Sequence, residues 1–217
     1  MAENHPVGFQ WVMEAKRRGG KLIHVDPRFT RTSALADQYV PLRVGSDIAF
    51  LGGVINYVLE NELDFREYVV AYTNAPVIVS DEFRDTEDLD GLFSGFDPET
   101  RTYDPATWQY AGAGSGESGE PEGDEGSDQD HNTQRETASA LQHETHGVGV
   151  ESHPQRDETL QHPNCVYQIL KRHYARYTPE MVAATCGVSE EAFLEVCKAW
   201  TENSNRERTT ALVYSVG

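Results

Sequence analysis

The stretch Lys21-Leu22-Ile23-His24-Val25-Asp26-Pro27-Arg28 decides how the first part of this 217-residue chain folds. Its aliphatic and β-branched run predicts a short buried strand over 21–25. Because proline cannot continue a strand ladder, the strand is expected to stop at Asp26. An acidic residue at the carboxyl end of such a strand can accept hydrogen bonds from ribose hydroxyls. Arg28, two residues later, can bind a phosphate through its bidentate guanidinium.

Two interpretations of this stretch stay open. In the first, Asp26 and Arg28 contact a nucleotide. In the second, Asp26 only caps the turn and pairs with Arg28. The chain has no GxGxxG motif, so the usual fingerprint of a dinucleotide-binding Rossmann fold is absent.

A helix is expected before the strand. Pro6 suits a first helical position, and Gly19-Gly20 suits a helix end. Val7, Trp11 and Ala15 recur at helical spacing and fall on one face of that helix.

A second strand and a long helix are expected after Arg28. Thr32 or Ser33 is expected to cap a short helical turn, and residues 39–42 to form the strand. The long helix then begins at residues 45–47. Its expected apolar stripe consists of Ile48, Leu51, Ile55, Val58 and Leu59. This order of elements predicts an α/β cofactor-binding part over 1–79, a partial doubly wound dinucleotide-binding-like unit.

The turn Arg43-Val44-Gly45-Ser46-Asp47 carries a second possible ligand contact. Ser46 suits the N-cap and Asp47 the first helical turn, and this structural role alone would explain both residues. Alternatively, Gly45 lets a ligand approach the backbone and Asp47 binds a purine edge. A carboxylate suits guanine, because guanine presents N1–H and its exocyclic amine as adjacent donors.

Three further parts are expected along the chain. Residues 80–110 are expected to form an acidic loop ordered by aromatic side chains. Residues 111–159 contain 12 acidic and 2 basic residues, and their low hydrophobicity predicts a disordered acidic insert. Its histidines, His131, His143, His146 and His153, match no known metal-site spacing. Residues 160–217 are expected to be a helical segment that ends in a strand over 210–217.

Within the helical segment, Thr178 and Ser189 are expected helix caps. The chain has three cysteines, Cys165, Cys186 and Cys197, an odd number without the close pairing of a CxxC metal motif or a disulfide framework. We therefore expect all three to be small core residues.

The charge of the chain disfavours several function classes. Its 36 acidic and 18 basic residues give a formal net charge of −18, which argues against nucleic-acid binding and docking on anionic membranes. Residues 181–200 imitate a helix-turn-helix, but Glu190, Glu191 and Glu195 would repel phosphates. No apolar run is long enough to span a membrane, and the first residues predict no signal peptide.

Several motifs together resemble one enzyme family. They are Ala2-Glu3-Asn4-His5-Pro6, residues 21–33, Ala36-Asp37, Gly45-Ser46-Asp47, and residues 90–97, 157–163, 176–179 and 211–217. In these motifs the chain resembles the catalytic subunit of respiratory, molybdopterin-dependent formate dehydrogenases, within the dimethyl sulfoxide reductase family. The resemblance covers nearly the whole chain except residues 111–156, where the family has a short connection.

The resemblance implies an oxidoreductase that converts formate to carbon dioxide in a two-electron oxidation. It implies a molybdenum or tungsten ion held by two molybdopterin guanine dinucleotides, a selenocysteine or cysteine ligand, and a 4Fe-4S cluster for electron transfer. It implies cofactor contacts from Glu3, Asn4, Asp26, Arg28, Arg43, Gly45, Ser46 and Asp47. For Glu3 and Asn4 this role rests on the resemblance alone.

The family's cluster-binding cysteines, metal ligand and catalytic arginine have no counterparts here. We therefore expect an internal fragment that is inactive alone and contains no catalytic or metal-ligating residue. Selenocysteine is encoded by a stop codon, so gene calling that restarted at Met1 after such a codon would explain the start of the sequence.

The resemblance also implies partners. They are the rest of the catalytic subunit, an iron–sulfur beta subunit and a membrane cytochrome gamma subunit, which act together in anaerobic respiration. It also implies a periplasmic location, without nucleic acid or direct membrane insertion.

Two alternatives remain open. A fragment of another molybdopterin oxidoreductase of the same family, with a different substrate, would share the guanine dinucleotide contacts. A non-enzymatic acidic interaction module would bind a protein partner but no guanosine nucleotide.

Overall fold

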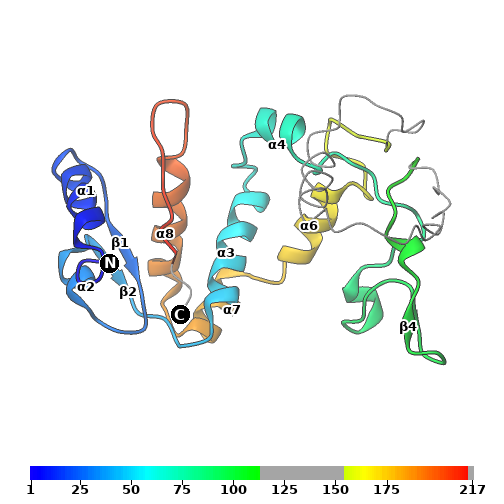
Figure 1. Cartoon of the computed structure of the whole chain (residues 1–217), viewed down its shortest axis with the longest axis horizontal. Helices are drawn as coiled ribbons and strands as arrows, with labels where there is room; N and C mark the ends of the chain where they lie inside the picture. Colours follow the sequence, from blue (N-terminus) through cyan, green and yellow to red (C-terminus); the bar gives the residue numbers. More distant parts are fainter. Residues whose placement is uncertain (113–153, 215–217) are drawn as a thin grey trace, which may run out of the picture. The chain divides into compact units, whose positions relative to one another are not determined.

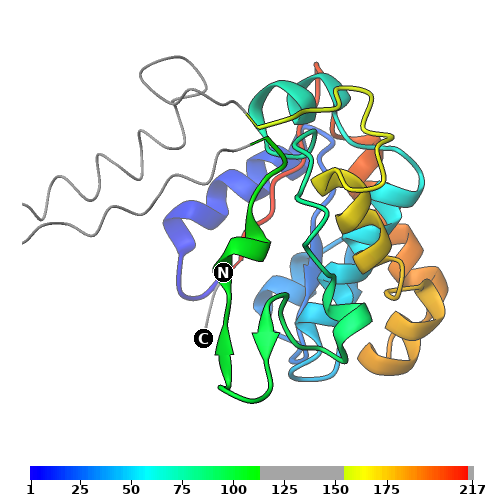
Figure 2. The same cartoon turned by 90° about the vertical axis from the view of Figure 1, so that its right-hand side faces the viewer.

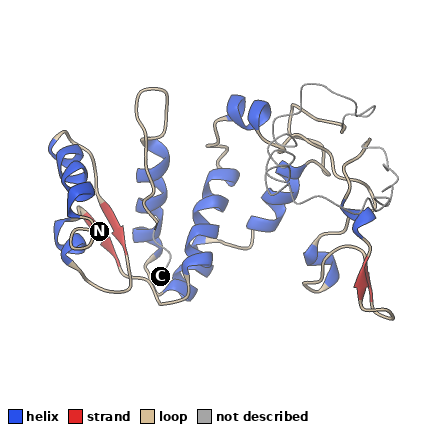
Figure 3. Ribbon diagram, in the orientation of Figure 1, coloured by secondary structure: helices blue, strands red, loops and turns tan. Residues whose placement is uncertain are grey.

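The computed structural model describes residues 1–112 and 154–214, so most of the expected insert, including its four histidines, lies outside the described residues. The chain divides into two compact units (Figure 1). The first comprises Met1–Val69 with Leu170–Gly217, and the second comprises Val70–Ile169. The described elements are mostly helices with a few short strands (Figure 3), which confirms the mixed helix and strand composition that the sequence predicts.

The first unit contains a two-stranded parallel sheet and most of the helices. β1 (Ile23–Val25) pairs with β2 (Gln38–Val40), with His24 opposite Tyr39. The helices that lie wholly within this unit are α1 (Pro6–Arg17), α2 (Arg31–Leu35), α3 (Asp47–Glu60), α7 (Pro179–Cys186) and α8 (Glu190–Glu202). α2 lies in the connection between the two strands, because parallel neighbours need a crossover rather than a tight turn.

α2 begins earlier than the sequence predicts. Its N-cap is Thr30, not Thr32 or Ser33. The Thr30 hydroxyl oxygen accepts from the Thr32 N–H at 3.2 Å, and Ser33 Oγ accepts from the Thr30 N–H at 2.8 Å. This reciprocal capping box draws Thr32 and Ser33 into the first turn, where both are buried.

Two glycines bring α3 close to its neighbours. A Cβ on Gly53 would lie 2.5 Å from Val182 Cγ2 and 2.7 Å from Phe193 Cζ, and a Cβ on Gly52 would lie 2.9 Å from the Tyr177 ring. Only residues without a side chain allow helices to approach this closely. The packing face of α3 is therefore set by its glycines.

The predicted apolar stripe of α3 is wrong in part for this reason. Leu59 is buried, but Ile48 is 77% exposed and Ile55 is also exposed. The buried apolar side chains on the glycine face are instead Ala49, Phe50 and Val54. The same difference occurs on α1, where Val7 and Trp11 are exposed and Phe9 is buried.

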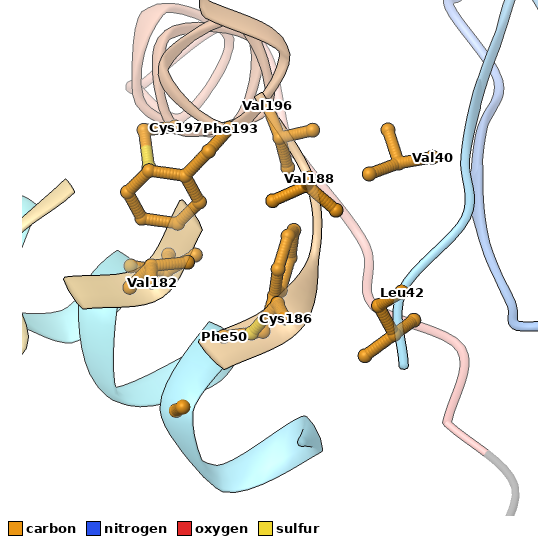
Figure 4. Packing of buried hydrophobic residues seen from close by; sticks show 11 residues of the cluster. Val40, Leu42, Phe50, Val182, Cys186, Val188, Phe193, Val196 and Cys197 are labelled. Carbon is orange, nitrogen blue, oxygen red and sulfur yellow. The ribbon is translucent and has the colours of Figure 1, made fainter. Parts of the chain in front are cut away.

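The hydrophobic core of the first unit joins β2, α3, α7 and α8 (Figure 4). It consists of Val40, Leu42, Ala49, Phe50, Val54, Val182, Cys186, Val188, Phe193, Val196 and Cys197. Phe50 meets Phe193 edge to face, with ring centroids 5.4 Å apart. Cys186 and Cys197 are fully buried here, and Cys165 is fully buried in the second unit, as predicted for small core residues.

The predicted caps of α7 and α8 are confirmed. Thr178 Oγ1 accepts from the Met181 N–H at 3.3 Å, and Ser189 Oγ accepts from the Ala192 N–H at 3.2 Å. Gly187 ends α7 in the left-handed region, with φ +71°.

The second unit is built from short elements. They are η1 (Thr86–Leu89), β3 (Phe96–Asp97), β4 (Thr102–Tyr103) and η2 (Pro105–Trp108), with β3 and β4 paired antiparallel (Figure 2). Residues 77–79 make isolated antiparallel bridges to Arg156, Cys165 and Tyr110. α4 (Arg66–Tyr72) and α6 (Val166–Tyr174) each extend across a boundary between the units.

The predicted final strand does not form over residues 210–214. Leu212, Val213 and Tyr214 are exposed there, and residues 215–217 lie outside the described part. A strand needs a neighbour to complete its ladder, and none of the described strands pairs with this segment.

Candidate functional site

The two predicted ligand-contact loops follow the carboxyl ends of the two parallel strands. Asp26 comes directly after β1, and its N–H donates to the carbonyl oxygen of Val40, the last residue of β2, at 3.2 Å. The turn over 43–47 follows β2 after two residues and leads into α3. Loops after the carboxyl ends of parallel strands meet at one edge of the sheet, where α/β folds bind ligands.

The Asp26 carboxylate is oriented by its own loop. Oδ1 accepts from the Arg28 N–H at 2.7 Å, so Asp26 does cap the turn as the structural interpretation expects. Oδ2 lies 3.7 Å from His24 Nε2. The side chain is 35% exposed, and a carboxylate has about four lone-pair sites. Acceptor capacity for a ligand therefore remains on both oxygens.

His24 is a residue of this site that the sequence reasoning missed. Its Nδ1 lies 2.9 Å from Ser33 Oγ, and its ring stacks beside Tyr39 with centroids 6.1 Å apart. Burial lowers the pKa of His24 below its ordinary value, and this effect outweighs the opposing one of the Asp26 charge. The spacing in the sequence could have indicated His24. Residues two apart in an extended strand lie on the same face, and His24 precedes Asp26 by two residues.

The turn over 43–47 leaves its backbone open at one point. Gly45 has φ +79°, and a Cβ placed on it would meet nothing within 4 Å. Asp47 is exposed in the first turn of α3. Ser46 occupies the N-cap position but does not cap with its hydroxyl, which instead donates to the Arg43 carbonyl oxygen at 2.6 Å, and the residue is 6% exposed. Ser46 thus closes the turn, while Gly45 and Asp47 face outward.

Arg43 is engaged with the end of another helix. Its Nη1 donates to the carbonyl oxygens of Ala184 and Thr185 at 2.8 and 3.2 Å, and its backbone N–H donates to Cys186 O at 2.8 Å. These carbonyls belong to the last turn of α7, where a cation also complements the helix dipole. The guanidinium therefore anchors the turn to α7.

The N-terminal residues that the resemblance singles out lie at the start of α2. Thr32 Oγ1 accepts from the Ala2 N–H at 3.0 Å, and Glu3 Oε1 lies 3.5 Å from Arg31 Nε. Glu3 and Asn4 are both exposed. α2 starts three residues after Arg28, which is exposed too, so these polar side chains share one end of the unit.

The arrangement suits a polar, partly anionic ligand. It combines two exposed or half-exposed carboxylates, an exposed guanidinium and an open glycine turn. Carboxylates accept from hydroxyl and amino groups, and a guanidinium donates to phosphate oxygens. Among the described helices, none is both long and apolar enough to cross a membrane.

Comparisons with known proteins match the whole chain. It is 43% identical over 216 residues to the alpha subunit of the formate dehydrogenase of Megalodesulfovibrio gigas, and 44% identical over 217 residues to the major subunit of formate dehydrogenase-O of Escherichia coli K12. Both alignments cover 100% of this chain and 18% of the relative. A shorter match, 42% identical over 82 residues, is to a sulfite dehydrogenase of Allochromatium vinosum and covers 38% of this chain and 8% of that protein. No family model matches the chain.

Proposed function

Because this chain belongs to the formate dehydrogenase alpha-subunit family, we propose that it forms one cofactor-binding section of an enzyme that oxidises formate to carbon dioxide. The conversion of HCOO⁻ to CO₂ releases one proton and two electrons. When bound, a molybdenum or tungsten ion held by two molybdopterin guanine dinucleotides supplies the two-electron redox chemistry. This section would contact the guanine dinucleotide portion and is expected not to oxidise formate by itself.

The observation that carries the proposal is the pair of outward-facing loops at the carboxyl ends of β1 and β2. Open space beside Gly45 fits a ligand that approaches the backbone. The Asp26 carboxylate keeps one free lone pair on each oxygen, which fits two adjacent ribose hydroxyls. The Arg28 guanidinium is exposed and fits a phosphate.

Asp47 would select the base. Guanine offers N1–H and its exocyclic amine to a carboxylate, whereas adenine has no N1–H to donate. Asp47 is exposed beside the open turn, which leaves its oxygens accessible.

The other predicted contacts would act in two ways. Arg43 and Ser46 would hold the turn in shape, since their polar groups bond within the fold. Glu3 and Asn4, exposed at the start of α2, would contact the cofactor directly, and this part of the proposal rests on the resemblance.

We prefer formate as the substrate because the alignments to formate dehydrogenases cover more of this chain than the alignment to a sulfite dehydrogenase. The formate dehydrogenase alignments cover the whole chain, while the sulfite dehydrogenase alignment covers 38% of it. Contacts shared among related oxidoreductases would produce such a shorter match. A different substrate for the whole enzyme is therefore the second candidate.

The remaining parts of the assembly are also proposals. The rest of the catalytic subunit, including a 4Fe-4S cluster, would cover apolar side chains such as Trp11 and Ile48, which are 68% and 77% exposed. An iron–sulfur beta subunit together with a membrane cytochrome gamma subunit would receive the electrons, with the catalytic subunit in the periplasm. Co-purification of these subunits with the full-length protein tests this assignment.

The nucleotide contacts can be tested with GDP, which represents the nucleotide end of the cofactor. Titration calorimetry of the chain should detect GDP binding and weaker ADP binding. Asp26→Asn should weaken GDP binding about tenfold, the usual size of a hydrogen bond to a charged group. Asp47→Asn should reduce the preference for GDP over ADP. Glu60→Gln, at the far end of α3, is the matched control and should bind like the wild type.

Two results would contradict the proposal. One is the absence of GDP binding by the folded chain. The other is binding that neither Asp26→Asn nor Asp47→Asn alters.

A further inference from the structure

We propose that His24 is a positioning residue, which holds the Asp26 carboxylate in the orientation that accepts two hydrogen bonds from a ribose. This inference rests on the proposed function and adds a residue to it. It starts from the contacts of the two Asp26 oxygens. Oδ1 is held by the Arg28 N–H at 2.7 Å, and Oδ2 faces His24 Nε2 at 3.7 Å. The hydrogen bond fixes one oxygen, and the neighbouring imidazole limits how far the other can rotate.

We assign the ring proton of His24 to Nε2, on the basis of its contact with Ser33. Ser33 Oγ accepts from the Thr30 N–H at 2.8 Å and lies 2.9 Å from His24 Nδ1. The Ser33 hydroxyl proton is then available to Nδ1. A neutral imidazole that accepts at Nδ1 carries its proton on Nε2. In this tautomer the Nε2–H lies beside Asp26 Oδ2, 3.7 Å away, as an electrostatic contact beyond hydrogen-bond distance.

The surroundings hold this arrangement in place. Ser33 is 5% exposed, so water competes little for its hydroxyl. The His24 ring stacks beside Tyr39, and the Phe29 ring meets Tyr39 edge to face at 5.2 Å. The capping box of α2 fixes Ser33 through Thr30. A series of contacts, from Thr30 to Ser33, then to His24 and then to Asp26, thus connects the start of α2 to the carboxylate.

Acid should weaken the contact between Asp26 and the ribose. The charged groups that act on His24 are the Asp26 carboxylate and the amino group of Met1, and the Tyr39 phenol lies beside its ring. Burial lowers the pKa of His24 below its ordinary value, which favours the neutral ring. Once protonated, the imidazolium attracts Oδ2 more strongly and competes with the ribose hydroxyl for it.

The experiment compares guanosine with 2′,3′-dideoxyguanosine, because the ratio of their dissociation constants isolates the two hydroxyls. The wild type should bind guanosine about tenfold more tightly at pH 7.5. His24→Leu should reduce this ratio to within about twofold. His24→Gln should keep it, because the Gln amide also places an N–H beside Asp26. His162→Leu, an exposed histidine in the second unit, is the matched control.

A pH series separates positioning from a purely structural role. The wild-type ratio should fall as the pH is lowered from 7.5, whereas the ratio of His24→Gln should stay constant. Circular dichroism confirms folding, and if His24→Leu does not fold, the comparison of wild type with His24→Gln decides alone. An unchanged ratio in folded His24→Leu, or equal pH profiles in wild type and His24→Gln, overturns the inference. Loss of wild-type GDP binding would instead overturn the proposed function itself.

Discussion

The backbone N–H of Asp26 donates to the carbonyl oxygen of Val40 at 3.2 Å, which ties the end of β1 to the end of β2. The bond continues the parallel pairing one residue past the strand, up to the point where Pro27 removes the next donor. Asp26 therefore sits at a fixed place on the sheet rather than in a free loop.

Gly53→Ala should destabilise the first unit. The added methyl would overlap Val182 and Phe193, and overpacking of a core costs about 1–3 kcal/mol. Urea denaturation measures the change in the free energy of unfolding. Gly8→Ala on α1 is the matched control, since its Cβ would lie 3.5 Å from the nearest atom, at the flexible end of Met1. It should be neutral or stabilising. Equal midpoints for Gly53→Ala and wild type would contradict this packing.

Arg43→Met should lower stability by about 1 kcal/mol, because the carbonyl oxygens of Ala184 and Thr185 lose their donor. Arg28→Met, at an exposed guanidinium, should leave stability unchanged and weaken GDP binding. Thermal unfolding and calorimetry on the same two variants separate the two roles. A loss of stability in Arg28→Met, or none in Arg43→Met, would show that these roles are assigned incorrectly.

Acid should destabilise the second unit through Asp157. The Thr159 hydroxyl and the N–H groups of Thr159, Gln161 and His162 lower the pKa of Asp157 to about 2. Because the folded-state pKa lies below the ordinary value near 3.8, the ionised carboxylate stabilises the fold at pH 4 and above. That contribution disappears as the pH falls toward 2.

Asp157→Asn should consequently show a shallower loss of stability between pH 4 and 2 than the wild type. Unfolding followed by fluorescence at stepped pH provides the measurement. Glu158→Gln, at an exposed neighbouring carboxyl, is the control and should follow the wild-type curve. Parallel curves for Asp157→Asn and wild type would argue against the loop contacts.

The thiols should be unreactive in the folded chain. Cys165, Cys186 and Cys197 are fully buried, and burial raises the pKa of Cys197 to about 12. A thiol reagent at pH 8 should label none of them rapidly in the native protein and all three in denaturant. Fast labelling of one thiol under native conditions would place that cysteine outside the core.

Much of the local structure could be predicted because it depends on short-range chemistry. Pro27 ends the first strand, and Thr178 and Ser189 cap their helices through side-chain oxygens three residues from the N–H they accept from. The positions of Asp26 after a strand and Asp47 at a helix start could be predicted because strand ends and helix starts are visible in the order of residues. The predicted N-cap of α2 was wrong because the capping box uses two side chains, Thr30 at the N-cap and Ser33 at the third helical position.

The tertiary structure alone decided which faces are buried and which polar groups are already used. Hydrophobicity predicted Ile48 and Ile55 for the core, but burial depends on how closely another element can approach. That approach is set by Gly53 against α7 and α8 and by Gly52 against the Tyr177 ring, all more than 120 positions away in the chain. Likewise, nothing near Arg43 in the sequence shows that its guanidinium meets the end of α7. The local sequence thus determined the helices and strands and where they end. Long-range contacts determined which side chains form the core and which polar side chains of the site remain accessible to a ligand.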